Sequence, residues 1–331
     1  MNLSWTIEVE RWAYRRPFTI ARTRLTHAAN LRATVTDGTF IGRGECEPHE
    51  SDARIVQRTE SQAREFLREH GADLDRQRLM TLMPCSPHRN AIDCALWDLE
   101  AKQSQTSVAA LLDIELPRSL PITGTVSLGP AADMVDEAVS VSAESSIIKI
   151  KLGGRIDEDA RRIEAVRAAV PDKTFIVDAN EGWSLAGLSE IAPVLAANGV
   201  AMIEQPLKRN ADSSVADANV SVSLCADESI TDRQSLERLP KGYDMINIKL
   251  DKTGGLTEAL ALISAARDRG LDYMVGSNGG TSLAAAPAYL LAANARYADI
   301  DSPMMLADDI AGGMQFAEGR VFAPTAALWG A

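Results

Sequence analysis

The distribution of apolar residues after Pro121 changes repeatedly between a strand pattern and a helix pattern. Short apolar, often β-branched runs alternate with longer stretches in which apolar residues recur at helical spacing. The predicted strands are Ile122–Val126, Ile147–Lys151, Phe175–Asp178, Ala201–Glu204, Ser221–Ala226, Met245–Leu250, Tyr273–Val275 and a weaker one near Tyr297–Asp301. The helices predicted between them include 131–143, 157–170, 184–198, 231–239 and 256–269. Eight strand–helix repeats predict an α/β fold with a closed parallel (β/α) barrel over 116–310.

An open doubly wound sheet is the alternative fold for this region. Such a sheet commonly has six strands and carries a GxGxxG turn after an early strand. The chain has eight predicted strands and no such turn at that place. The closed barrel is therefore the preferred prediction.

The first 115 residues have a different pattern, which predicts an α+β domain over 1–115. Residues 3–47 alternate as in a strand meander, and Asp37-Gly38 is typical of a hairpin turn within it. Two helices are predicted in the same domain, at 51–70 and 88–113. The C-terminal segment 311–331 is expected to return to this domain.

Composition and charge exclude several classes of protein. The 331 residues are 46% hydrophobic and 24% charged, as in ordinary soluble globular proteins. A formal net charge of −12 argues against nucleic acid or an anionic membrane as partner, because both attract basic surfaces. The N-terminus has no apolar signal segment, and the most apolar stretch, Ser282–Ala295, is too short to span a bilayer. We therefore expect a cytoplasmic protein; the sequence leaves its oligomeric state open, a homo-oligomer included.

The distribution of histidines limits the chemistry of the barrel. The last of the four histidines is His88, so the predicted barrel contains none. Any acid–base chemistry there must use Lys, Asp, Glu, Tyr or Cys, and a Ser-His-Asp triad is excluded. The four cysteines form no CxxC pair and no cluster with zinc spacing.

One charged residue recurs at the end of five consecutive predicted strands. These residues are Lys151, Asp178, Glu204, Asp227 and Lys249, and successive members are 22 to 27 residues apart, which is about one strand–helix unit. The carboxyl ends of the strands of a barrel meet at one rim, where active sites of this fold are built. We therefore expect the five side chains to lie together.

The three middle residues, Asp178, Glu204 and Asp227, are carboxylates that would repel one another without a cation. Oxygen ligands without His or Cys favour Mg²⁺, with Mn²⁺ as the second choice. A structural network in which each carboxylate pairs with a lysine is the alternative. Three carboxylates at consecutive strand ends favour the metal site.

The flanking lysines predict the type of reaction. Lys151 and Lys249 end strands two and six, which face each other across an eight-stranded barrel. Two bases on opposite faces of one carbon suit removal of a proton from one face and its return to the other, so a stereocentre is inverted. The metal would stabilise an enediolate formed from a carboxylate, and burial, the metal charge and nearby Lys149 would lower the lysine pKa. We expect Lys149 to tune this charge or to contact the substrate; an ordinary salt-bridging lysine is the alternative.

These motifs together resemble the enolase superfamily, specifically its muconate-lactonizing subgroup. The matching segments are Lys149-Ile-Lys151, Asp178-Ala-Asn180, Glu204-Gln-Pro206, Ala226-Asp-Glu-Ser229 and Asn247-Ile-Lys-Leu250, with Arg89–Leu99 in the N-terminal domain. The resemblance covers nearly the whole chain. It implies a barrel of modified TIM type with an N-terminal α+β capping domain that carries two specificity loops, near Thr19–Leu25 and Cys46–Asp52.

Within this subgroup the chain looks most like the L-Ala-D/L-Glu dipeptide epimerases, so a dipeptide is the implied substrate and cell-wall peptide metabolism the implied context. The run from Asn247 to Leu260 carries this likeness. The resemblance implies that Asp299 and Asp301 bind the dipeptide's α-ammonium group, with loop capping as the alternative. It also implies that Arg22, or Arg24 beside it, meets the distal carboxylate, with an ordinary surface arginine as the alternative.

The chain departs from these epimerases at the wall of the substrate pocket. They usually have Gly-Cys-Met-x-x-Thr-Ser after the seventh strand, whereas here the run is Gly276-Ser-Asn-Gly-Gly-Thr-Ser282. Ser277 and Asn278 therefore predict a smaller and more polar substrate-binding wall. The second specificity loop also looks shorter than in the enterobacterial enzymes.

The alternative functions within the subgroup are o-succinylbenzoate synthase and a muconate-type cycloisomerase, which share the lysines and the metal ligands. Their substrates, like those of N-succinyl amino acid racemases, carry no ammonium group, so the two aspartates disfavour them. A Schiff-base lyase would leave the three carboxylates without a purpose. A non-catalytic binding relative would have lost some of the five charged residues, and none is lost.

Overall fold

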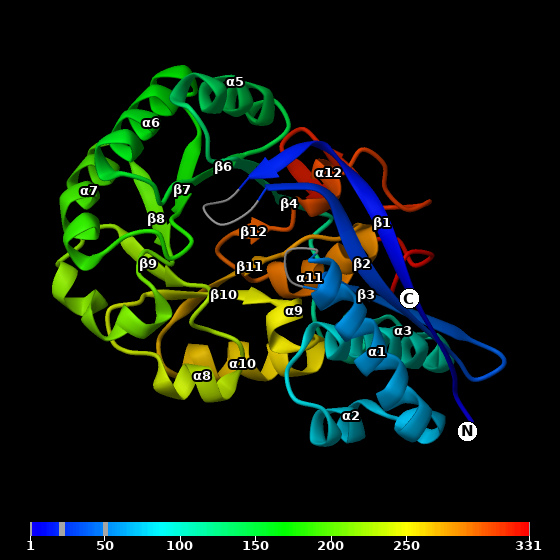
Figure 1. Cartoon of the computed structure of the whole chain (residues 1–331). Coiled ribbons are helices and arrows are strands. Elements are labelled where there is room, and N and C mark those ends of the chain that lie inside the picture. The colour runs from blue at the N-terminus through cyan, green and yellow to red at the C-terminus, as the bar shows by residue number, and fades with distance from the viewer. Residues whose placement is uncertain (1, 20–23, 49–51, 331) are drawn as a thin grey trace.

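The centre of the molecule is a parallel eight-stranded sheet that curves into a nearly closed barrel (Figure 1). The computed structural model describes residues 2–19, 24–48 and 52–330. The strands follow one another in chain order: β5 (Thr123–Val126), β6 (Ile147–Lys151), β7 (Thr174–Asp178), β8 (Val200–Glu204), β9 (Ser223–Ala226), β10 (Met245–Lys249), β11 (Asp272–Gly276) and β12 (Ala298–Asp299). Between β12 and β5 the Asp301 carboxylate accepts a hydrogen bond from the Thr125 backbone N–H at 3.0 Å. The predicted barrel is confirmed.

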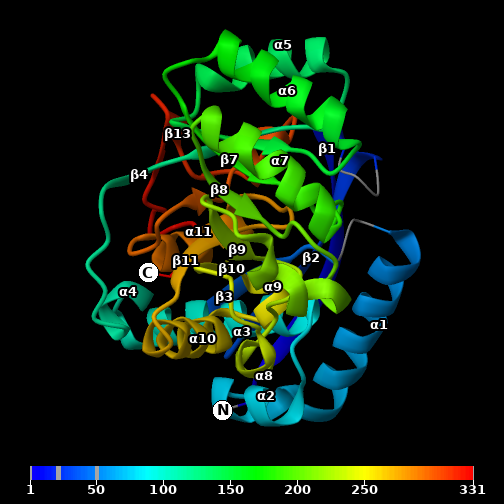
Figure 2. The same ribbon diagram turned by 90° about the vertical axis from the view of Figure 1, so that its left-hand side faces the viewer.

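Helices cover the outside of the barrel, as Figures 1 and 2 show for α5, α6 and α7. The elements that follow the strands are α5 (Ala131–Ser142), α6 (Ile156–Ala169), α7 (Leu185–Ala197), the 3-10 segment η2 (Arg209–Ala218), α8 (Arg233–Arg238), α9 (Leu250–Thr253), α10 (Leu256–Asp268), α11 (Ser282–Ala292) and α12 (Ser302–Met305). The five predicted barrel helices are confirmed, whereas α11 was not predicted. None of the helices in the described ranges combines the length and apolar content that a membrane crossing requires.

Alternation along each strand decides which side chains reach the barrel interior, because successive side chains of a strand point to opposite faces. On β7, Phe175 and Val177 join the apolar layer beneath the helices, whereas Ile176 packs inside the barrel. The inner apolar layer consists of Ile176, Met202, Cys225, Met245, Met274 and Tyr297. Asp178 lies two residues beyond Ile176 and Glu204 two beyond Met202, so a polar layer forms above the apolar one.

The N-terminal part packs an antiparallel three-stranded sheet against helices. Its elements are β1 (Ser4–Thr19), β2 (Arg24–Thr36), β3 (Ile41–Cys46), α1 (Ala53–His70), η1 (Gly71–Asp73), α2 (Arg76–Leu82), α3 (Pro87–Ser104) and α4 (Val108–Leu111). In Figure 1 the long strands β1 and β2 extend across the front of the barrel. Gly44 allows β3 to approach α3, because a Cβ atom there would lie 2.2 Å from the carbonyl oxygen of Ala91. The strand meander is confirmed.

The predicted helix over 88–113 is wrong at its C-terminal part. Helix α3 ends at Ser104, and Gln105 has the left-handed φ of 52° that terminates many helices. The chain then forms the separate short helix α4. No glycine follows Ser104 to signal the end of the helix, and the apolar pattern continues beyond it. The sequence therefore predicted one continuous helix.

Polar contacts from α3 fasten the N-terminal part to the barrel. The buried guanidinium of Arg89 donates to the carbonyl oxygens of Gly254 and Thr253 at 2.9 and 2.7 Å. The Asp93 carboxylate accepts from the backbone N–H and the hydroxyl of Thr257 at 2.9 and 2.7 Å. The Arg89–Leu99 motif therefore holds the segment that follows β10, which carries Lys249.

The chain's end adds a small sheet and a second set of contacts. The sheet consists of β4 (Ser119–Pro121), β13 (Phe316–Ala317) and β14 (Arg320–Phe322). The Trp329 indole donates to the carbonyl oxygen of Cys94 at 3.0 Å, and the Gly330 N–H donates to Asp98 at 2.8 Å. The predicted domain boundaries at 115 and 310 stay predictions.

Candidate active site

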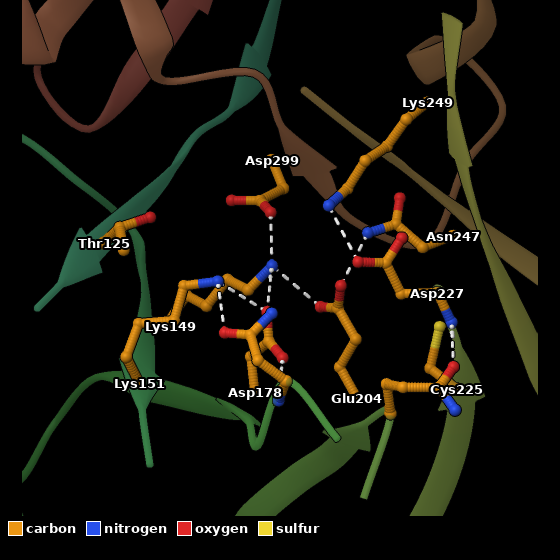
Figure 3. Close-up of polar contacts among 12 residues, drawn as sticks. Thr125, Lys149, Lys151, Asp178, Glu204, Cys225, Asp227, Asn247, Lys249 and Asp299 are labelled. Carbon is orange, nitrogen blue, oxygen red and sulfur yellow. Dashed lines mark hydrogen bonds and ion pairs between the residues drawn. The ribbon is translucent and has the colours of Figure 1, made fainter. Parts of the chain in front are cut away.

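Three buried carboxylates form the floor of the site (Figure 3). Asp178 and Glu204 end β7 and β8, and Asp227 follows β9 directly. Each is at most 2% exposed, and one oxygen from each lies within 4.8 Å of the others. Among the described residues this is the one group of three or more His, Cys, Asp or Glu side chains that could hold a metal ion.

Lys151 and Lys249 reach these carboxylates from opposite sides in Figure 3. Lys151 Nζ lies 2.6 Å from Asp178 Oδ2, and Lys249 Nζ lies 2.7 Å from Asp227 Oδ2. Both lysines are buried. The two ammonium groups therefore flank the carboxylates, as their positions on β6 and β10 predicted.

Lys149 lies between them and bridges several carboxylates. Its Nζ is 2.8 Å from Glu204 Oε2, 2.8 Å from Asp299 Oδ2 and 3.2 Å from Asp178 Oδ2. These neighbours raise the lysine pKa well above its usual range, although burial lowers it. The salt-bridging alternative for Lys149 is thus present in the structure, and its predicted role in tuning or substrate contact stays a prediction.

The electrostatics of the carboxylates fit a hard divalent cation. Burial and the charges of Asp178 and Asp227 raise the pKa of Glu204 to about 8, despite the ion pair with Lys149. The ammonium groups of Lys151 and Lys149 overcome burial and hold the pKa of Asp178 at about 2. One of the three carboxylates therefore resists ionisation at neutral pH, and a bound cation would favour its charged form. The oxygen-only donor set suits Mg²⁺ or Mn²⁺.

The pKa of Lys249 shifts opposite to the prediction. Burial lowers it, but the carboxylate of Asp227 more than compensates, so the net shift is upward. A lysine so paired is a poor base at neutral pH. The predicted lowering of the Lys249 pKa therefore requires a bound cation that neutralises the charge of Asp227.

Neighbouring amides fix the orientation of the carboxylates. Asn247 Nδ2 donates to Glu204 Oε1 at 2.8 Å. Gln205 Oε1 accepts from the backbone N–H groups of Asp227 and Ser229 at 2.9 and 3.2 Å, which joins the ends of β8 and β9. The motif residues beside the carboxylates thus hold their positions.

A small cavity lies above the lysines, and several predicted substrate-binding residues line it. Its walls include Lys149, Lys151, Lys249, Ser277, Asn278, Asp299 and Asp301, together with Tyr14 and Thr125. Asp299 Oδ2 is paired with Lys149, whereas its buried Oδ1 has no hydrogen-bond partner among the residues that the structure describes. Asp301 uses Oδ2 on the Thr125 N–H, and burial together with the charge of Asp299 raises its pKa to about 7. A cationic group in the cavity would therefore stabilise the charged form of Asp301.

The predicted arginines have a different outcome. Arg24 is exposed at the start of β2 and is not among the residues that line this cavity. Arg22 lies outside the described residues, as do parts of both predicted specificity loops. An arginine partner for the distal carboxylate stays a prediction.

Several residues of the site were not predicted, among them Tyr14 and Lys252. Tyr14 reaches the cavity wall from β1, and burial with the charges of Glu47 and Asp301 raises the pKa of its phenol. Lys252 of α9 contacts Asp227. No spacing rule pointed to Tyr14, whereas Lys252 lies inside the Asn247–Leu260 run.

Comparison with known proteins gives consistent results along the whole chain. Residues 133–330 match the family model for the enolase C-terminal domain-like group, and residues 3–113 match the mandelate racemase/muconate lactonizing enzyme N-terminal domain. The chain is 39% identical to the L-Ala-D/L-Glu epimerase of Escherichia coli strain K12, over 94% of this chain and 97% of that protein. It is 36% identical to an N-acetyl-D-glutamate racemase of a Pseudoalteromonas species, over 89% and 93%.

A solved structure agrees closely with the fold. The crystal structure of an enolase family member from Agrobacterium tumefaciens, with homology to dipeptide epimerases, superimposes with a TM-score of 0.93. The two sequences are 38% identical, and the match covers 99% of this chain and 100% of that one. That crystal contains sodium and L-Ala-L-Glu.

Proposed function

Because this chain belongs to the mandelate racemase/muconate lactonizing enzyme family of the enolase superfamily, we propose that it is a Mg²⁺-dependent dipeptide epimerase acting on L-Ala-D/L-Glu and related dipeptides. The observation that carries this proposal is the placement of Lys151 and Lys249 on opposite sides of the three carboxylates. Two opposed bases suit an inversion, in which one lysine removes a proton and the other returns a proton to the opposite face. The alternative enzymes of the subgroup share these lysines, so Asp299 and Asp301 separate the proposed reaction from theirs.

In the proposed reaction one lysine accepts the α-proton and the other donates a proton to the opposite face of the same carbon. Asp178, Glu204 and Asp227 would hold Mg²⁺, which supplies positive charge for the substrate carboxylate. With that charge present, Lys151 and Lys249 no longer need to neutralise Asp178 and Asp227. The lysine that acts as base can then be the neutral amine, while the opposite lysine remains the ammonium group that donates its proton.

Asp299 and Asp301 support a substrate with a free amine. Asp299 and Asp301 both line the cavity, and within the described residues Asp299 Oδ1 has no hydrogen-bond partner. A buried carboxylate is stabilised by a cationic partner, and the α-ammonium group of a dipeptide would provide one. This need disfavours substrates that lack the amine, including those of o-succinylbenzoate synthase and cycloisomerases.

The test is incubation with Mg²⁺ in D₂O and measurement of deuterium at the glutamate α-carbon by mass spectrometry or NMR. L-Ala-L-Glu and L-Ala-D-Glu should both exchange and interconvert, and N-acetyl-L-glutamate serves as the matched substrate without an ammonium group. The proposal is wrong if no dipeptide exchanges. Exchange of N-acetylglutamate alone would instead identify an N-acyl amino acid racemase.

The two lysines are tested separately. We expect Lys151→Ala and Lys249→Ala each to abolish epimerisation, while each variant still exchanges the α-proton of one stereoisomer. General-base removal commonly costs about 10²–10⁴-fold. A variant that exchanges both stereoisomers equally would contradict the opposed-base arrangement.

We also propose a cytoplasmic location and a role with peptides released from the cell wall. The location rests on the expectation from the sequence, and the role rests on the family resemblance alone. Comparison of dipeptide pools in cells with and without this protein would test the second.

A further inference from the structure

The ends of β9 and β10 are joined by a side chain. Their backbone pairing runs through Met245 with Cys225 and Ile246 with Ala226, and stops there. Beyond that point Lys252 Nζ donates to the carbonyl oxygens of Asp227 and Asn247, the latter at 3.2 Å. Lys252 thus bridges the two strand ends at the level of the carboxylate floor.

The same ammonium group also contacts the Asp227 side chain. Lys252 Nζ pairs with Oδ1, whereas Lys249 Nζ pairs with Oδ2 at 2.7 Å. The Lys252 side chain is 14% exposed and the Asp227 side chain 3%, so water screens this pair poorly. Each carboxylate oxygen of Asp227 therefore pairs with a different lysine. Of these two lysines, Lys252 also contacts the backbone carbonyl oxygen of Asp227, whose N–H is bonded to Gln205.

We infer that Lys252 is a positioning residue that fixes the orientation of the Asp227 carboxylate. Because Lys249 Nζ pairs with that carboxylate, Lys252 thereby also fixes the position of Lys249 Nζ. The inference rests on the proposed function and adds to it a residue with no predicted role. With Oδ1 and the carbonyl oxygen held by Lys252, Oδ2 stays directed toward Lys249 and the other carboxylates. Both the metal ligand and the base on this side of the substrate then depend on one ammonium group.

The arrangement is one-sided, which makes the inference testable. The contacts of Lys252 within the described ranges go to Asp227 and Asn247. Lys151 has separate partners, Asp178 and Asn180. Loss of Lys252 should therefore impair the proton transfer of Lys249 more than that of Lys151. A merely structural clamp would weaken both transfers equally.

The experiment measures α-deuterium exchange from each stereoisomer separately, at saturating Mg²⁺, in the full-length protein. Lys249→Ala first identifies the stereoisomer whose proton Lys249 removes. In Lys252→Met we expect exchange of that stereoisomer to fall about 10–100-fold, the usual effect of losing a partner of a metal ligand. Exchange of the other stereoisomer should fall several-fold less. Lys252→Arg, which keeps the charge and donors, should restore part of the ratio.

Two further measurements separate the outcomes. Lys241→Met removes the same charge from an exposed position and should leave the ratio unchanged. Mg²⁺ affinity by calorimetry should weaken about 10–100-fold in Lys252→Met. If that variant does not fold, Lys252→Gln supplies the ratio instead. Equal loss for both stereoisomers, or no loss, overturns the inference, whereas absence of exchange in the unmodified enzyme refutes the proposed function itself.

Discussion

Glu45 joins β3 to the start of α11 and provides a quantitative test of the electrostatics of this fold. Its Oε1 accepts from the Thr281 N–H at 2.7 Å and from Asn30 Nδ2 at 2.9 Å, and its Oε2 accepts from the Thr281 hydroxyl at 2.8 Å. The side chain is almost completely buried. Burial, with smaller contributions from Glu10 and Asp309, raises its pKa from 4.5 to about 7, although the Thr281 bonds lower it.

The direction of the pH effect follows from linkage. Glu45 is protonated in both states below about pH 4.5, so it has no differential effect there. As the pH rises toward 7, the unfolded chain releases this proton first, and the folded state loses stability relative to it. A tenfold change in proton affinity corresponds to about 1.4 kcal/mol, so the loss amounts to about 3 kcal/mol once the pH exceeds 7.

Glu45→Gln removes the titration and keeps most of the contacts. The amide oxygen can still accept from Thr281 and Asn30, and the amide NH₂ group can donate to the Thr281 hydroxyl. We expect the variant's free energy of unfolding, relative to the unmodified protein, to rise by about 3 kcal/mol between pH 4.5 and pH 8. Urea denaturation in EDTA buffers across this range measures the difference.

Glu65→Gln on the exposed face of α1 is the matched control, and its difference should stay within about 0.5 kcal/mol at every pH. Parallel stability curves for Glu45→Gln and the unmodified protein would contradict a raised pKa of Glu45. They would mean that Glu45 remains ionised at little cost in the folded state.

The remaining predictions concern the site and its support. Asp301→Asn should raise the KM for L-Ala-L-Glu about 10–100-fold, since a charged hydrogen bond contributes about 1.5–3 kcal/mol. The inhibition constant of N-acetyl-L-glutamate, which lacks the ammonium group, should not change. Equal changes in both constants would contradict ammonium binding by Asp301. Mg²⁺ at 100 times its Kd should stabilise the unmodified protein against urea by about 2.7 kcal/mol, and Asp227→Asn should lose this gain; its persistence would place the metal elsewhere. Arg89→Met should lower the free energy of unfolding, measured by urea denaturation, by about 3–5 kcal/mol, because buried carbonyl oxygens lose their donor. The control Arg58→Met, at an exposed position, should change it by less than about 0.5 kcal/mol. A loss below about 1 kcal/mol in Arg89→Met would contradict the role of Arg89 in holding the two parts together.

Local pattern was sufficient for most of the barrel. Each strand from β5 to β11 lies within about two residues of its prediction, because a short apolar, β-branched run is a local property of the chain. The predicted strand ends, together with their spacing of about one strand–helix unit, placed Asp178, Glu204 and Asp227 at one rim. Helix α3 shows the limit of such reasoning, since its end at Ser104 depends on the left-handed turn at Gln105 and not on a change in apolar period.

Contacts across the fold were beyond the reach of the pattern. The positions of Lys151 and Lys249 on strands four apart predicted that the two side chains oppose each other. The pairing of Lys149 with Asp299, 150 residues away, could not be predicted in this way. Tyr14 reaches the cavity because β1 extends over the barrel. The local sequence pattern around Tyr14 does not indicate that it lies near the barrel.

The strand–helix order, the rim of charged residues and the family resemblance could thus be predicted from the sequence alone. These properties depend on residue types at regular spacing, which a chain displays before it folds. The ion-pair partners, in contrast, follow from the tertiary structure. Lys149 bridges Glu204 and Asp299, and Lys252 and Lys249 both pair with Asp227. Ion pairing depends on distances of a few ångströms between strands far apart in sequence, and only closure of the barrel sets those distances.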